Sequence, residues 1–135
     1  MNFINGNEIK NALQTTYRVY LCGDLKKPQD LQWIQDDKNE IGVSKYDCFA
    51  ADQPHYHTCA TEYNFVICGA TKIFLIDDEQ EYLFKEGSIF VIPPMTKYAS
   101  KHLEGTEILF FKSPGGNDKK IVDIGGFLKE WLGSW

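Results

Sequence analysis

The chain has 135 residues, 43% of them hydrophobic and 14% aromatic, which is enough for one domain with a buried core. Its net charge of −5 argues against binding to a nucleic-acid backbone, because such binding needs clustered lysines and arginines. The pairs Lys26-Lys27 and Lys119-Lys120 are short, and we expect them to be solvated charges in loops.

The sequence also gives an expectation about its compartment. No apolar run approaches the roughly 18–20 residues that span a bilayer, so we expect no membrane segment. The start, MNFINGNEIKNAL, lacks the basic and then apolar pattern of a signal peptide. The cysteines form no C-x-x-C pair, which favours free thiols over a disulfide or zinc role. We therefore expect a soluble, cytoplasmic protein.

The pattern along the chain is mainly that of short strands. Residues 7–16 place Ile9, Ala12 and Leu13 at helical spacing, so the sequence predicts a short helix near its start. From Tyr17 onward, short runs rich in β-branched and aromatic residues indicate an antiparallel barrel or sandwich. The run IDDEQEYL is typical of a hairpin turn. The runs that we expect to be strands are residues 17–23, 31–35, 41–50, 55–59, 62–69, 71–77, 81–87, 88–94, 96–102 and 106–112.

The last part of the chain departs from this pattern. The run PGGND follows Ser113, and we expect residues 113–120 to be a loop that leads to a final helix. Residues 123–133 place apolar side chains at three- and four-residue steps. This spacing indicates an amphipathic C-terminal helix, with Asp123 as its N-cap.

Two of the three histidines lie one residue apart, in the run PHYHTCATEYNFVICG. Alternate side chains of a strand share a face, so His55 and His57 point the same way, about 7 Å apart. Glu62 needs a bend near residues 59–61 to come back beside the imidazoles. Two histidines and one carboxylate are the ligand set of non-haem iron and of many manganese or zinc sites. The spacing leaves open a second interpretation, in which the histidines are satisfied by hydrogen bonds on a barrel wall.

This run resembles the first motif of the cupin superfamily, G-x5-H-x-H-x(3,4)-E-x6-G. His55, His57, Glu62 and Gly69 stand at the motif's positions, whereas Phe49 replaces its leading glycine.

The run GSIFVIPPMTKYASKH is similar to the second cupin motif, G-x5-P-x-G-x2-H-x3-N. Gly87 and Pro93 match it. Met95, Tyr98 and His102 replace its glycine, histidine and asparagine.

The resemblance covers roughly residues 41–113 and implies a single cupin domain over residues 1–135. The implied fold is mainly β, an antiparallel jelly-roll barrel of about six to eight strands, with a short N-terminal helix and a C-terminal helix. Its site would lie inside the mouth of the barrel and take a small-molecule ligand. Such proteins often form homodimers.

The resemblance also implies a divalent transition metal (Fe, Mn, Zn, Ni or Co) bound by His55, His57 and Glu62. Tyr98 stands where the family has a fourth ligand. It could ligate as phenolate, hydrogen-bond to bound water, act as a catalytic acid, or pack as a structural side chain. We expect His102 to be exposed to solvent, and we do not count it as a ligand.

Three functional classes follow. The first is a metal-dependent enzyme, such as a dioxygenase or isomerase, that acts on a small polar molecule while Tyr98 transfers a proton. The second is a metal-independent sugar isomerase or epimerase that uses His55, His57 and Tyr98 as acid and base. The third is a cupin that binds a small ligand without catalysis. The motifs do not assign the substrate, because pocket-lining residues determine it.

Overall fold

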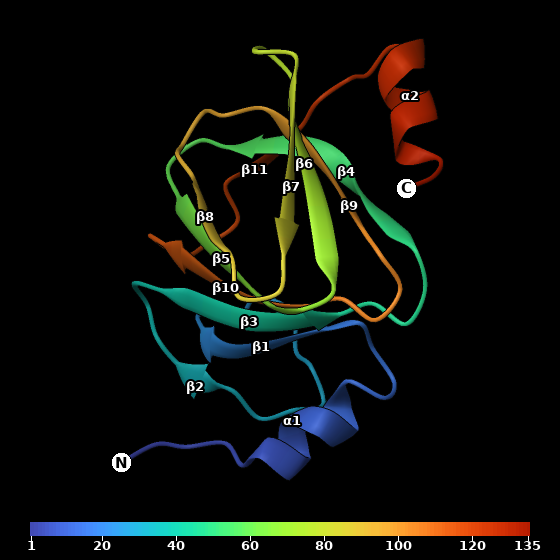
Figure 1. The fold of residues 1–135 in the computed structure, drawn as a ribbon. Coiled ribbons are helices and arrows are strands. Elements are labelled where there is room, and N and C mark those ends of the chain that lie inside the picture. Colours follow the sequence, from blue (N-terminus) through green and yellow to red (C-terminus); the bar gives the residue numbers. More distant parts are fainter.

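Two mainly antiparallel sheets face each other in the computed structural model, which describes residues 1–135 (Figure 1). The six-stranded sheet has the order β2-β1-β3-β10-β5-β8, and the five-stranded sheet has the order β11-β4-β9-β6-β7. The strands of the first sheet are β1 (Arg18–Gly23), β2 (Ile34–Gln35), β3 (Glu40–Lys45), β5 (Thr61–Cys68), β8 (Ile89–Ile92) and β10 (Glu107–Ser113). Those of the second are β4 (Ala50–His57), β6 (Ala70–Leu75), β7 (Gln80–Lys85), β9 (Tyr98–His102) and β11 (Lys119–Ile121).

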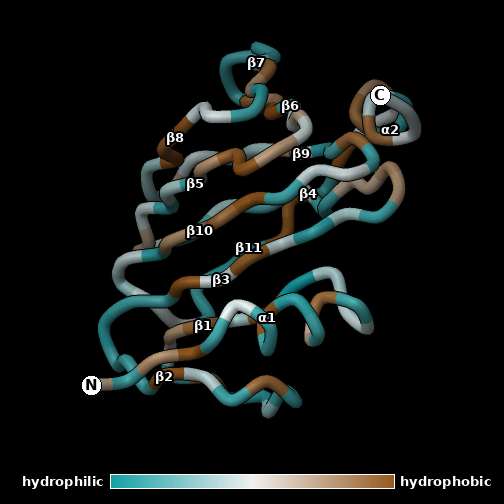
Figure 2. The backbone as a smooth tube through the Cα atoms, turned by 60° about the horizontal axis from the view of Figure 1, so that its bottom comes forward, coloured by the Kyte–Doolittle hydropathy of each residue, from teal (hydrophilic) through white to brown (hydrophobic).

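A helix lies near each end of the chain, α1 (Gly6–Ala12) and α2 (Gly126–Leu132). This arrangement confirms the predicted mainly β, jelly-roll fold with two flanking helices. Neither helix is long and apolar enough to cross a membrane. Figure 2 shows that hydrophobic residues follow the strands, whereas the turn between β6 and β7 is hydrophilic, as IDDEQEYL predicted.

Each helix covers a different part of the barrel. Leu13, the C-cap residue of α1, packs with Val19 and Val43 of the six-stranded sheet. The helix α2 places Leu128 against Phe74 and Ala99 on the outer face of the five-stranded sheet. Because α2 covers that face, all five residues of β9 are buried, including those that point away from the barrel interior.

Several predicted boundaries were wrong. Residues 13–16 lie outside α1, and of residues 31–35 only Ile34–Gln35 form a strand. The predicted strand 41–50 is split, because the chain crosses from one sheet to the other between Lys45 and Ala50. The last helix begins at Gly126 with Gly125 as N-cap, instead of at Asp123.

The stretch predicted to be a loop after Ser113 contains β11, which pairs with β4 at the edge of the five-stranded sheet. Lys119 lies opposite His57 in this pairing, and Ile121 lies opposite His55. Lys119 is therefore not a loop charge, and it enters the pocket described below.

The glycine that closes the first motif is required by the backbone. Gly69 has a φ of +82°, in the left-handed region that L side chains rarely adopt. A Cβ at this position would also lie 2.6 Å from the Cα of Thr106, which is too close.

The outer face of the six-stranded sheet exposes apolar side chains in adjacent register. Tyr63 lies opposite Val91 and Phe65 lies opposite Ile89, and all four are exposed. The homodimer expected from the resemblance stays a prediction.

Candidate functional site

A pocket of about 530 Å³ opens between the two sheets, and all four predicted site residues line it. His55 and His57 come from β4 in the five-stranded sheet, whereas Glu62 comes from β5 in the six-stranded sheet. The chain bends between these strands at residues 58–60, which confirms the predicted bend. Tyr98 begins β9 and lies opposite His55 in the register. The structure therefore brings the two motifs together.

The imidazole of His55 is held in one orientation. Its Nδ1 lies 2.8 Å from the carbonyl oxygen of Gln53. A carbonyl oxygen only accepts, so Nδ1 carries a proton and Nε2 is directed at the other groups of the pocket. Burial lowers the pKa of His55 to about 4, although the bond to Gln53 opposes this change.

The hydroxyl of Tyr98 lies between two of the predicted residues. Its oxygen is 2.8 Å from Nε2 of His55 and 2.8 Å from Oε2 of Glu62. A phenol has one proton and can donate to only one of them. The second contact therefore needs a further proton, either on the imidazole or on the carboxyl group. We call His55, Tyr98 and Glu62 the acid chain. A neutral imidazole, a phenol and a carboxylate together lack one of the protons that both hydrogen bonds of the Tyr98 oxygen require.

Tyr98 keeps its own proton. Burial raises the pKa of Tyr98 well above its usual value, and the charge of Glu62 raises it further. The ring packs against Ile73 and Ile92, so the side chain is also part of the barrel core. Tyr98 therefore combines a packing role with a hydroxyl at the centre of the polar site.

His57 is oriented by a carboxylate that the sequence analysis missed. Its Nδ1 lies 2.8 Å from Oδ1 of Asp118, whose Oδ2 accepts the backbone N–H groups of Cys59 and Ala60. Burial raises the pKa of Asp118, but these backbone donors and His57 outweigh it and lower the pKa to about 2. Because Asp118 is ionised, it accepts a hydrogen bond from Nδ1–H of His57, and Nε2 is directed away from the carboxylate.

Asp118 could not be identified from its local pattern. It is 61 positions from His57, in the run after Ser113 that was predicted to be a loop. Only the pairing of β11 with β4 brings it beside the histidine.

The expectation that His102 is exposed was wrong. His102 is only 4% exposed, and its ring stacks on Tyr46 at a centroid distance of 4.2 Å. Its Nε2 lies 3.1 Å from Oδ2 of Asp52. Alternation along β9 turns His102 into the barrel, in the same direction as Tyr98, while α2 covers the opposite face.

Asp52 is the centre of a second polar cluster in the same pocket. Its Oδ2 accepts from Ser100 at 3.1 Å and lies 3.9 Å from Nη2 of Arg18. Burial raises the pKa of Asp52, but hydrogen bonding and charge from His102, followed by Arg18, hold it well below its usual range. We call the group the Asp52 cluster; its members are Arg18, Tyr46, Asp52, Ser100 and His102.

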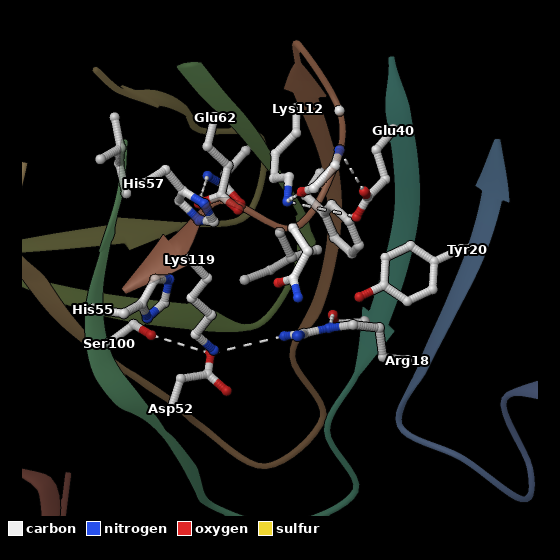
Figure 3. A pocket seen from close by; sticks show the side chains of 18 of the residues that line it. Arg18, Tyr20, Glu40, Asp52, His55, His57, Glu62, Ser100, Lys112 and Lys119 are labelled. Atoms are coloured by element: carbon white, nitrogen blue, oxygen red, sulfur yellow. Dashed lines mark hydrogen bonds and ion pairs between the residues drawn. The ribbon is translucent and has the colours of Figure 1, made fainter. Parts of the chain in front are cut away.

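Four lysines line the pocket: Lys26 and Lys27 come from the loop after β1, whereas Lys112 and Lys119, which Figure 3 shows, come from strands. Lys112 is buried, and its Nζ lies 3.7 Å from Oε1 of Glu40 and 3.0 Å from the carbonyl oxygen of Gly116. Lys119 has no such partner.

The donor atoms bear on the predicted metal. Both histidines have Nδ1 engaged by an oxygen acceptor and direct Nε2 elsewhere, which is the usual arrangement of metal-ligating imidazoles. No three His, Cys, Asp or Glu side chains in the structure are grouped closely enough to hold an ion together. The ligand role of His55, His57 and Glu62 stays a prediction.

No family model matches the sequence, and no curated protein matches it. Solved structures do match. Pac13 from Streptomyces, a nucleoside dehydratase, has a TM-score of 0.57 at 14% identity over 66% of this chain and 71% of its own. KdgF from Halomonas has a TM-score of 0.56 at 22% identity over 67% of this chain and 87% of its own. An RmlC-like cupin from Shewanella frigidimarina has a TM-score of 0.54 at 18% identity over 62% of this chain and 72% of its own. The chain has the cupin fold.

Proposed function

We propose that this cupin-fold protein is an acid–base enzyme, which removes a proton from a small polar molecule in the pocket and returns a proton to it. Dehydration, isomerisation and epimerisation are reactions of this kind. One observation carries the proposal: two different proton-exchanging arrangements line the same pocket. His57 has Nδ1 held by a carboxylate, whereas the Tyr98 hydroxyl lies within hydrogen-bond distance of two acceptors, His55 and Glu62.

In this scheme His57 is the base. Its Nε2 takes a proton from a C–H group of the substrate, while Asp118 stabilises the imidazolium that forms. The ring centroids of His57 and His55 are 5.2 Å apart, so base and acid can act on one small molecule.

Tyr98 is the acid. In a dehydration, the electrons of the broken C–H bond form the new double bond, and the C–O bond breaks. The hydroxyl of Tyr98 donates its proton to the departing oxygen and takes another from the carboxyl group of Glu62. Water is released, and the proton on His57 is then returned to the acid chain through solvent.

The comparisons support this type of chemistry in the fold. Pac13 is described as a nucleoside dehydratase, and its structures with uridine include tyrosine-to-phenylalanine and histidine-to-glutamine variants. Histidine and tyrosine side chains line the pocket of this chain.

Solvent exchange tests the proposal, because it detects removal of a proton whatever the product is. The protein is incubated in D2O with nucleosides, sugars and hydroxy acids, and NMR measures deuterium incorporation and turnover. We expect Tyr98→Phe and His57→Gln each to lower the rate by about 10²- to 10⁴-fold. The exposed Tyr82→Phe serves as the matched control. No reaction with any compound, or equal rates in the wild type and Tyr98→Phe, would contradict the proposal.

A divalent metal is the second candidate, because a cation can take the place of the proton that the acid chain needs. His55, His57 and Glu62 would hold it, with Tyr98 as a further donor. The ion would supply Lewis acidity. Plasma mass spectrometry, which measures the metal content of the wild type and of Glu62→Gln, tests whether the site binds a metal. Near-stoichiometric metal that is lost in the variant supports it, and no metal in either protein after incubation with each ion contradicts it.

A further inference from the structure

Besides Lys26 and Lys27 of the loop after β1, three basic side chains from three different strands line the pocket, and they differ in how their charges are balanced. Arg18 of β1 lies near Asp52, and Lys112 of β10 lies near Glu40. Lys119 of β11 lines the same pocket, but its ammonium group makes no hydrogen bond and no ion pair within the chain. Figure 3 shows these side chains directed into the space between the sheets.

The fold directs Lys119 inward. It lies opposite His57 in the register of β11 and β4, and both residues line the pocket. Both lysines of this strand are exposed, but Lys120, whose side chain points to the other face, does not line the pocket. Partial burial lowers the pKa of Lys119, an effect that the charge of Asp52 opposes.

The two carboxylates that face Lys119 are already engaged. Oδ2 of Asp52 lies within hydrogen-bond distance of Ser100 and His102. Oε2 of Glu62 accepts from Tyr98 and lies 3.4 Å from Nδ2 of Asn64. The Lys119 ammonium therefore has three donors that no group of the protein uses.

We propose that Lys119 binds an oxyanion of the substrate, so that the enzyme acts on a small molecule with a carboxylate or phosphate group. The identification of this molecule as a substrate rests on the proposed function. Because Lys119 and His57 are register partners, the anion is held beside the base. A carboxylate there is placed so that the adjacent C–H group lies toward His57.

Binding of a probe tests the anion site independently of turnover. Malonate is titrated into the ¹⁵N-labelled protein at constant ionic strength, with its neutral isostere malonamide as the matched ligand. We expect malonate to shift the imidazole signals of His57 and malonamide to leave them unchanged. Lys119→Gln should weaken malonate binding by about tenfold or more, because a charge-assisted bond is lost. Lys119→Arg should retain it, and Lys120→Gln is the control on the same strand.

The outcomes separate this site from the proposed function. If malonate binds to the wild type and to Tyr98→Phe equally, but not to Lys119→Gln, the anion site stands even where no turnover is found. If malonate does not bind, or binds Lys119→Gln as well as the wild type, the anion site is overturned. Turnover of neutral compounds only, with no effect of Lys119→Gln, would also overturn it and leave the acid–base proposal intact.

Discussion

The pocket contains two clusters of buried and partly buried polar side chains, and they differ in whether their charges are balanced. In the Asp52 cluster, a carboxylate lies among Arg18, His102 and the hydroxyl of Ser100. In the acid chain, one phenol lies between an imidazole and a carboxylate that both need its proton. Balanced buried charges hold a structure together when they stay paired. A group of titratable side chains that lacks a proton is poised to exchange one, so we assign stability to the first cluster and chemistry to the second.

The largest expected effect is on the Asp52 cluster. Asp52→Ala leaves Arg18 and His102 without their carboxylate, and we expect the free energy of unfolding in urea to fall by about 3–5 kcal/mol. The exposed Asp78→Ala, in the turn between β6 and β7, should change it by less than about 0.5 kcal/mol. A similar fall in the free energy of unfolding in both variants would contradict a stabilising role for the Asp52 cluster.

Asp118→Asn should have a smaller effect, because asparagine keeps an oxygen that can accept from the backbone N–H groups. Asp118→Asn weakens its bonds to His57 and to two backbone N–H groups, which we expect to cost about 1.5–3 kcal/mol at pH 7. The pKa of Asp118 is about 2 in the folded protein against its usual 3.8, so its stabilisation is present above pH 4 and lost as pH falls through 2. The variant should therefore lose less stability on acidification than the wild type. The exposed Asp123→Asn should retain the wild-type pH dependence.

A substitution of Tyr98 tests whether the acid chain contributes to stability as the Asp52 cluster does. Tyr98→Phe keeps the packing against Ile73 and Ile92, and the pocket lets water reach the freed partners. We expect the free energy of unfolding to fall by only about 1 kcal/mol. A loss as large as that of Asp52→Ala would mean that the acid chain is structural too.

The smallest effect concerns the turn that leads into Tyr98. Met95 replaces the glycine of the second motif and has a φ of +64°, which is strained for a side chain other than glycine. Met95→Gly should raise the free energy of unfolding by up to about 1 kcal/mol, since relief of strain exceeds the entropy cost of glycine. Gly87→Ala, at a φ of +82° with open space around it, should lower it by about 1 kcal/mol. A stabilising Gly87→Ala would contradict this explanation of the motif.

The fold was predictable because its signals are local. Strand alternation, the hairpin turn and the bend before Glu62 depend on neighbours in sequence, and the spacing of His55, His57 and Glu62 follows from them. The long-range partners were not predictable. Asp118 reaches His57 only through the edge strand β11, whose short sequence follows two glycines and reads as a loop.

The Asp52 cluster shows the same limit. Arg18 and Asp52 belong to different sheets, and their approach depends on how the sheets pack. The exposure predicted for His102 was wrong because alternation along β9 continues to its end. Lys119 resembled a solvated loop charge because it lies in β11, the short edge strand that reads as a loop in the sequence.

The protonation of the histidines tests the central claim most directly. Long-range ¹H–¹⁵N NMR of the imidazoles at pH 7 reports each ring nitrogen, and the chain has only three histidines. We expect His57 to be neutral with its proton on Nδ1, and the Nε2 signal of His55 to shift in Tyr98→Phe while that of His57 stays. A His57 that is protonated on Nε2, or a His55 signal that does not respond to the loss of the hydroxyl, would contradict the assignment of base and acid.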